Sequence, residues 1–314
     1  MSGHALVIGE ALVDVVVRQD GTEEAHPGGS PANVAIGLGR LGRDVELLAY
    51  VASDANGERV REHLAASQVA LAAGSLDAPR TSVATARLDA TGAATYDFDL
   101  EWAISASAAP LAEPIVVHTG SIAAVLAPGA AQVRDIIESV RETATVTYDP
   151  NARPTLMGDP SVARKIVEEM VALADVVKVS DEDLEWLSGS PDVDAVARGW
   201  LELGPAFVVV TRGGSGAIAF LAGGREVEVA APRVDVADTV GAGDSFMGGL
   251  IDGLWSAELL GAAKRDALHA IADDVLAEIL ERCARIAAIT VSRPGANPPG
   301  SAELEPGTYR VPGT

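Results

Sequence analysis

The sequence predicts an α/β protein in which helices cover both faces of a central, mostly parallel sheet. Short runs of β-branched and apolar residues alternate along the chain with Ala- and Leu-rich segments of helical length, and this alternation is typical of a doubly wound fold. Several of the predicted strands are almost continuously apolar, as expected of parallel strands that are buried on both faces. Ligands of such sheets bind beyond the carboxyl ends of the strands, so the residues that follow a strand are the first candidates for function.

The predicted elements follow one another in regular order. The strands share dense runs of valine, isoleucine and leucine and are expected at Leu6–Ile8, Val45–Val51, Ile115–Thr119, Thr145–Asp149, Val176–Val179 and Phe207–Thr211. The helices are longer and rich in alanine, and they are expected at Pro31–Leu41, Asn56–Ala66, Gly129–Glu142, Pro160–Ala174, Asp181–Ser188, Asp192–Leu203, Asp244–Trp255 and Lys264–Thr290. The last of these segments is long enough to form two helices.

Two segments depart from this pattern. Val13–Arg18 looks like an exposed strand, and Thr81–Trp102 alternates apolar with small or polar residues around a turn at Asp89–Gly92. We expect strands from about 12–28 and 81–103 to form a small separate β-sheet. The sheet is either a decoration at the edge of the domain or a lid that closes over a substrate.

The composition limits the classes of function. The 314 residues include 45 acidic and 23 basic side chains, a net charge of −22, which argues against binding to nucleic acid or to an anionic membrane. The single cysteine excludes an internal disulfide and indicates a reducing compartment. The N-terminal apolar run lacks a basic leader, and no run reaches the roughly 20 apolar residues that span a bilayer. We therefore expect one cytoplasmic domain over residues 1–314.

The segment Asp238–Leu250 carries the strongest chemical signal. Gly241, Ala242 and Gly243 are small enough for their backbone N–H groups to approach a ligand, at the start of a helix that begins near Asp244. Such a helix N-terminus favours an anion, typically phosphate. The Asp244 carboxylate does not suit a phosphate ligand, but it can accept a proton from a hydroxyl group that attacks the phosphate. Alternatively, Asp244 only caps the helix.

A second glycine pattern has a structural explanation. Gly37, Gly39 and Gly42 match the G-x-G-x-x-G spacing of dinucleotide-binding proteins, but that motif must open a helix directly after a strand. Here it lies inside a helix that begins near Pro31, so the glycines indicate helix packing and a helix end. The chain also lacks a P-loop motif and the protein-kinase signatures.

Two segments resemble a known family. The stretches GGSPANVAIGLGRLG and DTVGAGDSFMGGL are similar to the two signatures of the ribokinase/PfkB sugar kinases. The resemblance implies a ribokinase-like fold with a small β-sheet lid, and ATP- and Mg²⁺-dependent phosphorylation of a sugar hydroxyl. It implies that Asp244 is the catalytic base and that Gly241–Gly243 form the anion hole. The positions that it implies for the sugar are Asp14, Gly28, Gly29 and Asn33.

The resemblance extends to the nucleotide site. The segment Val208–Gly216 is similar to the strand and glycine turn that line the ATP site, and it is also compatible with a hairpin turn into Ala217–Leu221. The family's Asn-x-x-Glu segment corresponds to Ser180 and Asp183, so either Asp183 or the adjacent Glu182 is expected to hold Mg²⁺ through water. The acidic run could equally be the solvated first turn of a helix. The nucleotide-binding residues implied are Lys178, Ser180, Thr211, Gly213, Gly216 and, in the loop after residue 292, Asn297. Asp238 corresponds to a K⁺ ligand of some members.

The substrate is suggested by one further segment. Asp149-Pro-Asn151-Ala-Arg153 resembles the D-P-N-x-R pattern of bacterial fructokinases, and it favours fructose, with Arg153 at the substrate; a Pro-turn is the alternative. His118 is expected either in the sugar pocket or in the core.

A 2-keto-3-deoxygluconate kinase or a ribokinase-type kinase remains an alternative. A catalytically silent sugar- or nucleotide-binding regulator is disfavoured, because Asp244 is retained. As in related kinases, the lid could pair in a homodimer.

The net charge leads to a local expectation. ATP is itself a polyanion, so most of the acidic side chains should lie on the outer surface. The binding pocket should be neutral or positive around Arg153 and Arg293.

Overall fold

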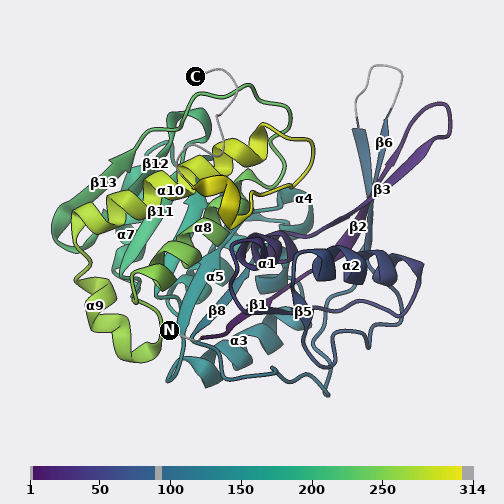
Figure 1. The fold of residues 1–314 in the computed structure, drawn as a ribbon, viewed down its shortest axis with the longest axis horizontal. Coiled ribbons are helices and arrows are strands. Elements are labelled where there is room, and N and C mark those ends of the chain that lie inside the picture. The colour runs from purple at the N-terminus through teal and green to yellow at the C-terminus, as the bar shows by residue number, and fades with distance from the viewer. Residues whose placement is uncertain (1–2, 89–93, 306–314) are drawn as a thin grey trace.

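The computed structural model describes residues 3–88 and 94–305 of the protein (Figure 1). Within these residues, nine strands form the main sheet: β1 (Ala5–Ile8), β4 (Val45–Leu48), β5 (Ala70–Leu71), β8 (Val116–Gly120), β9 (Thr145–Asp149), β10 (Val176–Ser180), β11 (Phe207–Thr211), β12 (Ala217–Leu221) and β13 (Arg225–Val229). Their order is β13-β12-β11-β10-β9-β8-β1-β4-β5. All pairs from β5 to β11 are parallel, and only β12 and β13 join antiparallel. The predicted fold class is confirmed.

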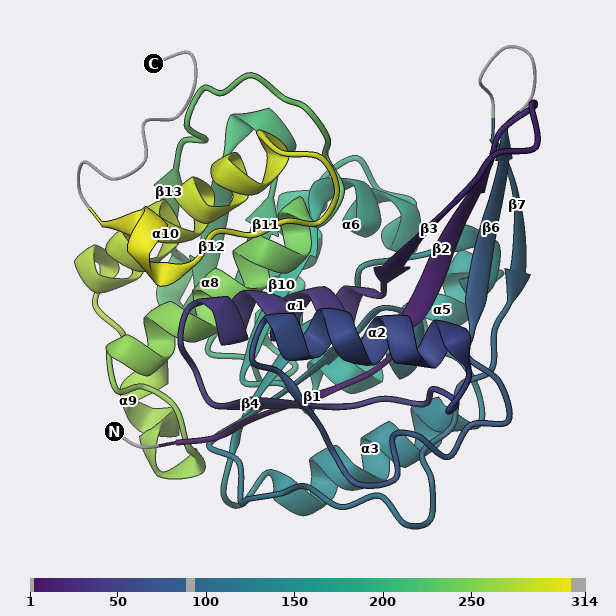
Figure 2. The same cartoon turned by 45° about the vertical axis from the view of Figure 1, so that its right-hand side comes forward.

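Helices cover both faces of the main sheet (Figures 1 and 2). On one face Val7 and Val209 pack against α1 (Ser30–Arg40), α2 (Ala55–Ala66), α8 (Ala242–Ser256) and α10 (Asp273–Val291). On the other face Leu6 and Val208 pack against α3 (Gly129–Val140), α5 (Pro160–Val171), α6 (Asp181–Ser188) and α7 (Val193–Leu201). The strands alternate their side chains between these two cores, as the pleat of a sheet requires.

Most predicted elements are present, with shifted ends. The strand from Val45 ends at Leu48 rather than at Val51. The predicted helix Lys264–Thr290 is divided into α9 (Arg265–His269) and α10. The short helix α4 (Pro154–Met157) was not predicted. The hairpin into Ala217–Leu221 is confirmed, because β12 pairs antiparallel with β11.

Four of the described strands form the expected small sheet, in the order β3-β2-β6-β7. They are β2 (Leu12–Val17), β3 (Glu23–Gly28), β6 (Val83–Leu88) and β7 (Ala94–Asp99). This sheet projects from the body of the molecule (Figure 2). The predicted turn at Asp89–Gly92 lies outside the described residues.

Two tight connections join the small sheet to the segments that follow β1 and β4. Gly29, between β3 and α1, has φ +112, and a Cβ atom there would lie 2.3 Å from the carbonyl oxygen of Glu10. On the other strand pair, the Asp54 carboxylate caps α2 and accepts hydrogen bonds from the amide (2.9 Å) and the hydroxyl (2.7 Å) of Thr81, just before β6. Both contacts fix the base of the small sheet next to the strand ends of the main sheet.

Glycines of α1 allow close packing against α8 and against the end of α2. A Cβ atom at Gly37 would lie 4.0 Å from the Cα atom of Gly248, and one at Gly39 would lie 2.0 Å from the carbonyl oxygen of Ser67. Gly42 has φ +83 just after the end of α1. The prediction that these glycines serve packing and a helix end is therefore confirmed. Among the described residues, no helix is long and apolar enough to cross a membrane.

Candidate active site

Two adjoining cavities lie at the carboxyl ends of the parallel strands. The smaller has a volume of about 360 Å³ and the larger about 910 Å³. The residues that line both are Asn151, Arg153, Thr239, Ala242 and Gly243. The N-terminus of α8 therefore lies where the cavities meet, so groups bound in the two cavities would approach each other there.

The start of α8 depends on glycine. Gly241, which precedes the first helical residue Ala242, has φ +75, and a Cβ atom there would lie 2.6 Å from the Cβ atom of Ala296. A Cβ atom at Gly243 would lie 2.9 Å from Nζ of Lys178. The Ala242 amide donates a hydrogen bond of 3.3 Å to the carbonyl oxygen of Thr239. The first N–H groups of a helix have no acceptor within the helix, so the remaining amides of this turn are the donors that it can present to an anion.

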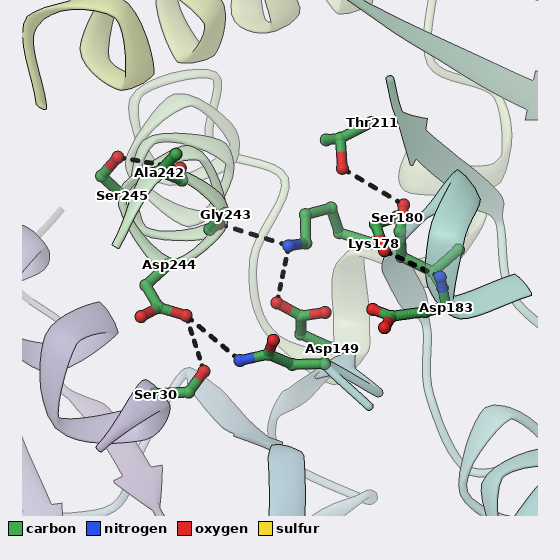
Figure 3. Close-up of polar contacts among 12 residues, drawn as sticks. Ser30, Asp149, Lys178, Ser180, Asp183, Thr211, Ala242, Gly243, Asp244 and Ser245 are labelled. Atoms are coloured by element: carbon green, nitrogen blue, oxygen red, sulfur yellow. Dashed lines mark hydrogen bonds and ion pairs between the residues drawn. The ribbon is translucent and has the colours of Figure 1, made fainter. Parts of the chain in front are cut away.

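Asp244 lies in the first turn of α8 and is only 8% exposed. Its Oδ1 accepts a hydrogen bond of 2.6 Å from the Ser30 hydroxyl (Figure 3). Its Oδ2 accepts one of 2.8 Å from Nδ2 of Asn33. Nδ2 of Asn151 lies 3.4 Å from Oδ1. The helix is capped by Gly241 rather than by Asp244, so the interpretation of Asp244 as a simple cap is wrong. Instead, neutral donors orient the carboxylate in the cavity wall.

The smaller cavity contains most of the residues predicted for the sugar. Those that line it are Asp14, Gly29, Asn33 and Arg153. Gly28 contributes indirectly, because a Cβ atom there would lie 2.2 Å from Oδ2 of Asp14. Burial raises the pKa of Asp14, and the charges of Arg153 and His26 act against that rise.

His118 lies in the core and does not reach the sugar pocket. It lies within β8, two residues before the strand ends, and is 2% exposed. Its Nδ1 lies 3.1 Å from the hydroxyl of Thr147. Burial, and then the nearby charge of Lys178, lowers the pKa of His118 to about 3. The residue that reaches the cavity is Ser121, beyond the end of β8, so the predicted sugar-pocket role of His118 is corrected to a neutral core residue.

The larger cavity contains most of the residues predicted for the nucleotide and the metal. Those that line it are Lys178, Ser180, Glu182, Asp183, Thr211, Gly213 and Gly216. The Ser180 hydroxyl accepts a hydrogen bond of 3.0 Å from the Asp183 amide and so caps α6 (Figure 3). The acidic run is therefore both the first turn of a helix and part of the cavity wall.

Two predicted residues near the C-terminus lie outside the cavities. The Asn297 side chain accepts a hydrogen bond of 2.5 Å from Arg40 at the end of α1 and is not part of the lining of the larger cavity. Arg293 pairs with Glu303, so it adds no charge to the pocket, contrary to expectation. This loop still contacts the site, because Ala296 lies against Gly241.

Asp238 holds the same loop to the turn before α8. Its Oδ1 accepts a hydrogen bond of 3.0 Å from the Val240 amide, and its Oδ2 accepts one of 2.9 Å from the Gly295 amide. These backbone hydrogen bonds hold the pKa of Asp238 below its usual range. A carboxylate has further lone pairs, so this arrangement leaves room for a cation ligand.

The charges differ between the two cavities. The larger cavity is lined by the cations Arg153, Lys178 and Arg233 and by the acids Asp181, Glu182 and Asp183. The smaller is lined by Arg153 and by the acids Glu10, Asp14 and Asp244. The cations and acids of the larger cavity therefore balance, as expected of a neutral pocket, whereas acids outnumber the cation in the smaller cavity, contrary to expectation, and offer acceptors for hydroxyl groups.

Three contributors to the site were not predicted as such. Glu10 is buried directly after β1 and lines the smaller cavity. Burial raises its pKa to about 7, against the effects of the Ser121 hydroxyl and Arg153. Ser30 holds Asp244, and Asn151 joins Asp244 to Arg153, whose Nη1 donates to Oδ1 of Asn151 at 2.8 Å. Glu10 and Asn151 both follow strands, so the rule of strand ends would have found them.

This fold and this site are those of a ribokinase-like sugar kinase. The chain belongs to the pfkB family of carbohydrate kinases, whose model matches residues 3–303. It is 36% identical over 262 residues to the fructokinase of Klebsiella pneumoniae, which covers 81% of this chain and 85% of that protein.

Two solved structures are similar over 94% of this chain and 94% of their own. One is the fructokinase of Xylella fastidiosa with bound ATP (TM-score 0.79, 25% identity). The other is a double mutant of the fructokinase of Vibrio cholerae with fructose, ADP and potassium ion bound (TM-score 0.77, 26% identity).

Proposed function

We propose that this protein transfers the γ-phosphoryl group of ATP to D-fructose and forms fructose 6-phosphate. One observation carries the proposal: the oriented carboxylate of Asp244 lies beside the helix N-terminus that the two cavities share. The fructokinases among the relatives support the choice of sugar. The D-P-N-x-R segment, which brings Arg153 into both cavities, supports it too.

In this reaction the sugar occupies the smaller cavity and ATP the larger. The attacking hydroxyl gives its proton to the Asp244 carboxylate while its oxygen forms a bond to the γ-phosphorus. The bond from that phosphorus to the β–γ bridging oxygen breaks, and ADP leaves with the electron pair. Backbone N–H groups at Gly241–Gly243 stabilise the negative charge on the transferred group.

The remaining sugar contacts follow from the lining of the smaller cavity. Asp14 and Asn33 offer acceptors and a donor for sugar hydroxyls. Ala84 of β6 and Phe98 of β7 also line this cavity, which supports the role of the small sheet as a lid. Pairing of the lid in a homodimer stays a prediction. A cytoplasmic location also belongs to the proposal, supported by the single, free and buried Cys283.

The wall of the larger cavity fits a magnesium ion held mainly by water and phosphate. Among residues 3–88 and 94–305, no group of three or more His, Cys, Asp or Glu side chains gathers to hold a metal directly. Glu182 and Asp183 line the cavity, and carboxylates that reach Mg²⁺ through water suit this ion. Bound there, Mg²⁺ would neutralise phosphate charge. Asp238 remains the candidate for K⁺.

A comparison of sugars tests the proposed substrate. ADP formation is measured with Mg²⁺-ATP and D-fructose, D-ribose or 2-keto-3-deoxygluconate. We expect kcat/KM for fructose to exceed the others by roughly 10²-fold. A sugar whose hydroxyls do not pair with the buried polar groups of the site leaves those groups unpaired and is strongly rejected. A preference for 2-keto-3-deoxygluconate or ribose would overturn the choice of fructose and leave the kinase intact. Tight sugar binding without ADP formation from any sugar would indicate a silent regulator.

A further inference from the structure

A buried ion pair lies directly behind the phosphate-facing turn. Asp149 ends β9 and Lys178 lies in β10, and the register of these parallel strands places the two residues side by side. Oδ2 of Asp149 lies 2.7 Å from Nζ of Lys178, and their side chains are 1% and 4% exposed (Figure 3). Two charges in the interior lose most of their hydration, and an apolar pair is often as stable or more so. Stability of the fold alone therefore does not explain why a charged pair occupies these two positions.

Lys178 also contacts helix α8. Its Nζ donates a hydrogen bond of 3.3 Å to the carbonyl oxygen of Gly243 (Figure 3). A Cβ atom at position 243 would lie 2.9 Å from this nitrogen, so the ammonium group occupies the space that a side chain would fill. A side chain at position 243 would therefore displace the Lys178 ammonium group, so glycine is needed here for this contact as well as for the approach of a phosphate.

This contact acts on the peptide group that follows Gly243, whose N–H continues the row of backbone donors of the proposed anion hole. The carbonyl of Gly243 and the N–H of Asp244 belong to the same peptide unit, and that N–H lies in the first turn of α8. A cation that donates to the carbonyl oxygen polarises the peptide and makes its N–H a stronger donor, because hydrogen bonds in a chain reinforce one another in a low dielectric. The positive charge itself also lies close to the turn.

The surroundings fix the ammonium group in that position. Asp149 holds it from the sheet and Gly243 from the helix. The neighbouring His118 is neutral, because burial and then the Lys178 charge lower its pKa to about 3, so it does not compete for Asp149. Lys178 also lines the larger cavity, but its side chain is only 4% exposed and its ammonium group is directed to Asp149 and Gly243, so it has little surface with which to contact a phosphate.

We propose that Lys178 is a positioning residue that strengthens the anion hole from behind, through the Gly243–Asp244 peptide, and that Asp149 is its anchor. The inference rests on the proposed kinase function for its effect on turnover. The polarisation of the peptide does not depend on turnover and can be measured separately.

The first test separates stability from catalysis. Lys178→Met and Asp149→Asn each leave one buried charge without its partner, so we expect each to lower Tm. The double variant has no buried charge, so its Tm should return towards that of the unaltered protein. Its kcat should stay about 10- to 100-fold low, which is less than the roughly 10²- to 10³-fold loss on removal of an oxyanion donor, because the donor here is weakened and not removed. Recovery of kcat together with Tm would overturn the proposal.

A second test, nucleotide binding, distinguishes action from behind the turn from direct contact with the nucleotide. If Lys178 acts from behind, Lys178→Met should lower kcat while the Kd for ADP changes by less than about 3-fold, because uniform binding is unaffected. Weakened ADP binding with unchanged kcat would assign Lys178 to direct nucleotide contact instead. Lys165→Met, at an exposed position of α5, is the matched control and should change neither quantity.

A spectroscopic readout does not need turnover. Gly followed by Asp occurs in the chain only at Gly158–Asp159 and Gly243–Asp244, so labelling glycine carbonyls with ¹³C and aspartate nitrogens with ¹⁵N gives one signal for each pair. In Lys178→Met the Asp244 amide proton should move to higher field and the Asp159 signal should not. An unmoved Asp244 signal would overturn the proposal. If the signal moves but the unaltered protein phosphorylates no sugar, the kinase proposal fails and the polarised peptide stands.

Discussion

The hydroxyl of Ser30 donates a hydrogen bond of 2.6 Å to the carboxylate of Asp244, although the two residues are 214 positions apart in the chain. Ser30 begins α1 and Asp244 lies in the first turn of α8. The two helices pack through Gly37 and Gly248. Because this packing fixes the distance between the helices, it also fixes the orientation of the carboxylate that we propose as the base.

Ser30→Ala should therefore impair turnover more than folding. A hydrogen bond to a charged group contributes about 1.5–3 kcal/mol, and its loss would leave Asp244 less well oriented. We expect kcat for fructose to fall about 10-fold or more. Ser75→Ala is the control, because Ser75 is also buried and its hydroxyl bonds the backbone of Leu47 and Ala49, which line neither cavity. Equal kcat values for the two variants would contradict the role of Ser30.

Glu10 should make the stability of the protein depend on pH. Burial raises its pKa from 4.5 to about 7, so the folded protein binds this proton more tightly than the unfolded chain does. Its stabilising contribution is then fully present below about pH 4.5 and is lost as the pH rises through about 7. Glu10→Gln lacks this titration, so its Tm relative to the unaltered protein should increase with pH over that window.

Thermal unfolding measured at a series of pH values checks this prediction. Glu202→Gln, at an exposed position at the end of α7, provides the comparison for loss of a carboxyl group. Parallel Tm curves for Glu10→Gln and the unaltered protein would show that Glu10 does not titrate in this range.

Two glycines with similar backbone angles should respond differently to substitution. Gly241 has φ +75 and Gly42 has φ +83, but only at Gly241 would a Cβ atom meet a neighbour, Ala296, at 2.6 Å. Alanine in this left-handed region costs about 1–2 kcal/mol, so both variants should lose stability. Gly241→Ala should also lose turnover by about 10²-fold, because it displaces the turn at the reacting groups. Unchanged kcat in Gly241→Ala would contradict the position of the anion hole.

The sequence was most informative where function depends on local backbone. The turn Gly241–Gly243 and the carboxylate of Asp244 lie within four consecutive positions, so composition and order alone indicated a helix start with a base beside it. The alternation of strands and helices likewise predicted the main sheet and its carboxyl edge. That edge led directly to Arg153, which lies in both cavities.

Partners from distant segments were not predictable in the same way. Whether His118 faces a cavity or the core depends on where β8 ends and on the helices above it, and the strand pattern does not contain that information. Asn297 was expected at the nucleotide, but its side chain accepts a hydrogen bond from Arg40, 257 positions earlier in the chain. The pairing of Asp149 with Lys178 depends on the register of β9 and β10, which only the folded sheet defines.

The assignment of Asp244 as the base is the central claim, and Asp244→Asn tests it most directly. The amide has nearly the same shape but cannot accept the proton, so kcat for fructose should fall by about 10²- to 10⁴-fold. The Kd for fructose, measured by calorimetry without nucleotide, should change only a few-fold. If Asp244→Asn instead binds fructose and phosphorylates it at a rate within about threefold of the unaltered protein, another group removes the proton and the proposed mechanism is wrong.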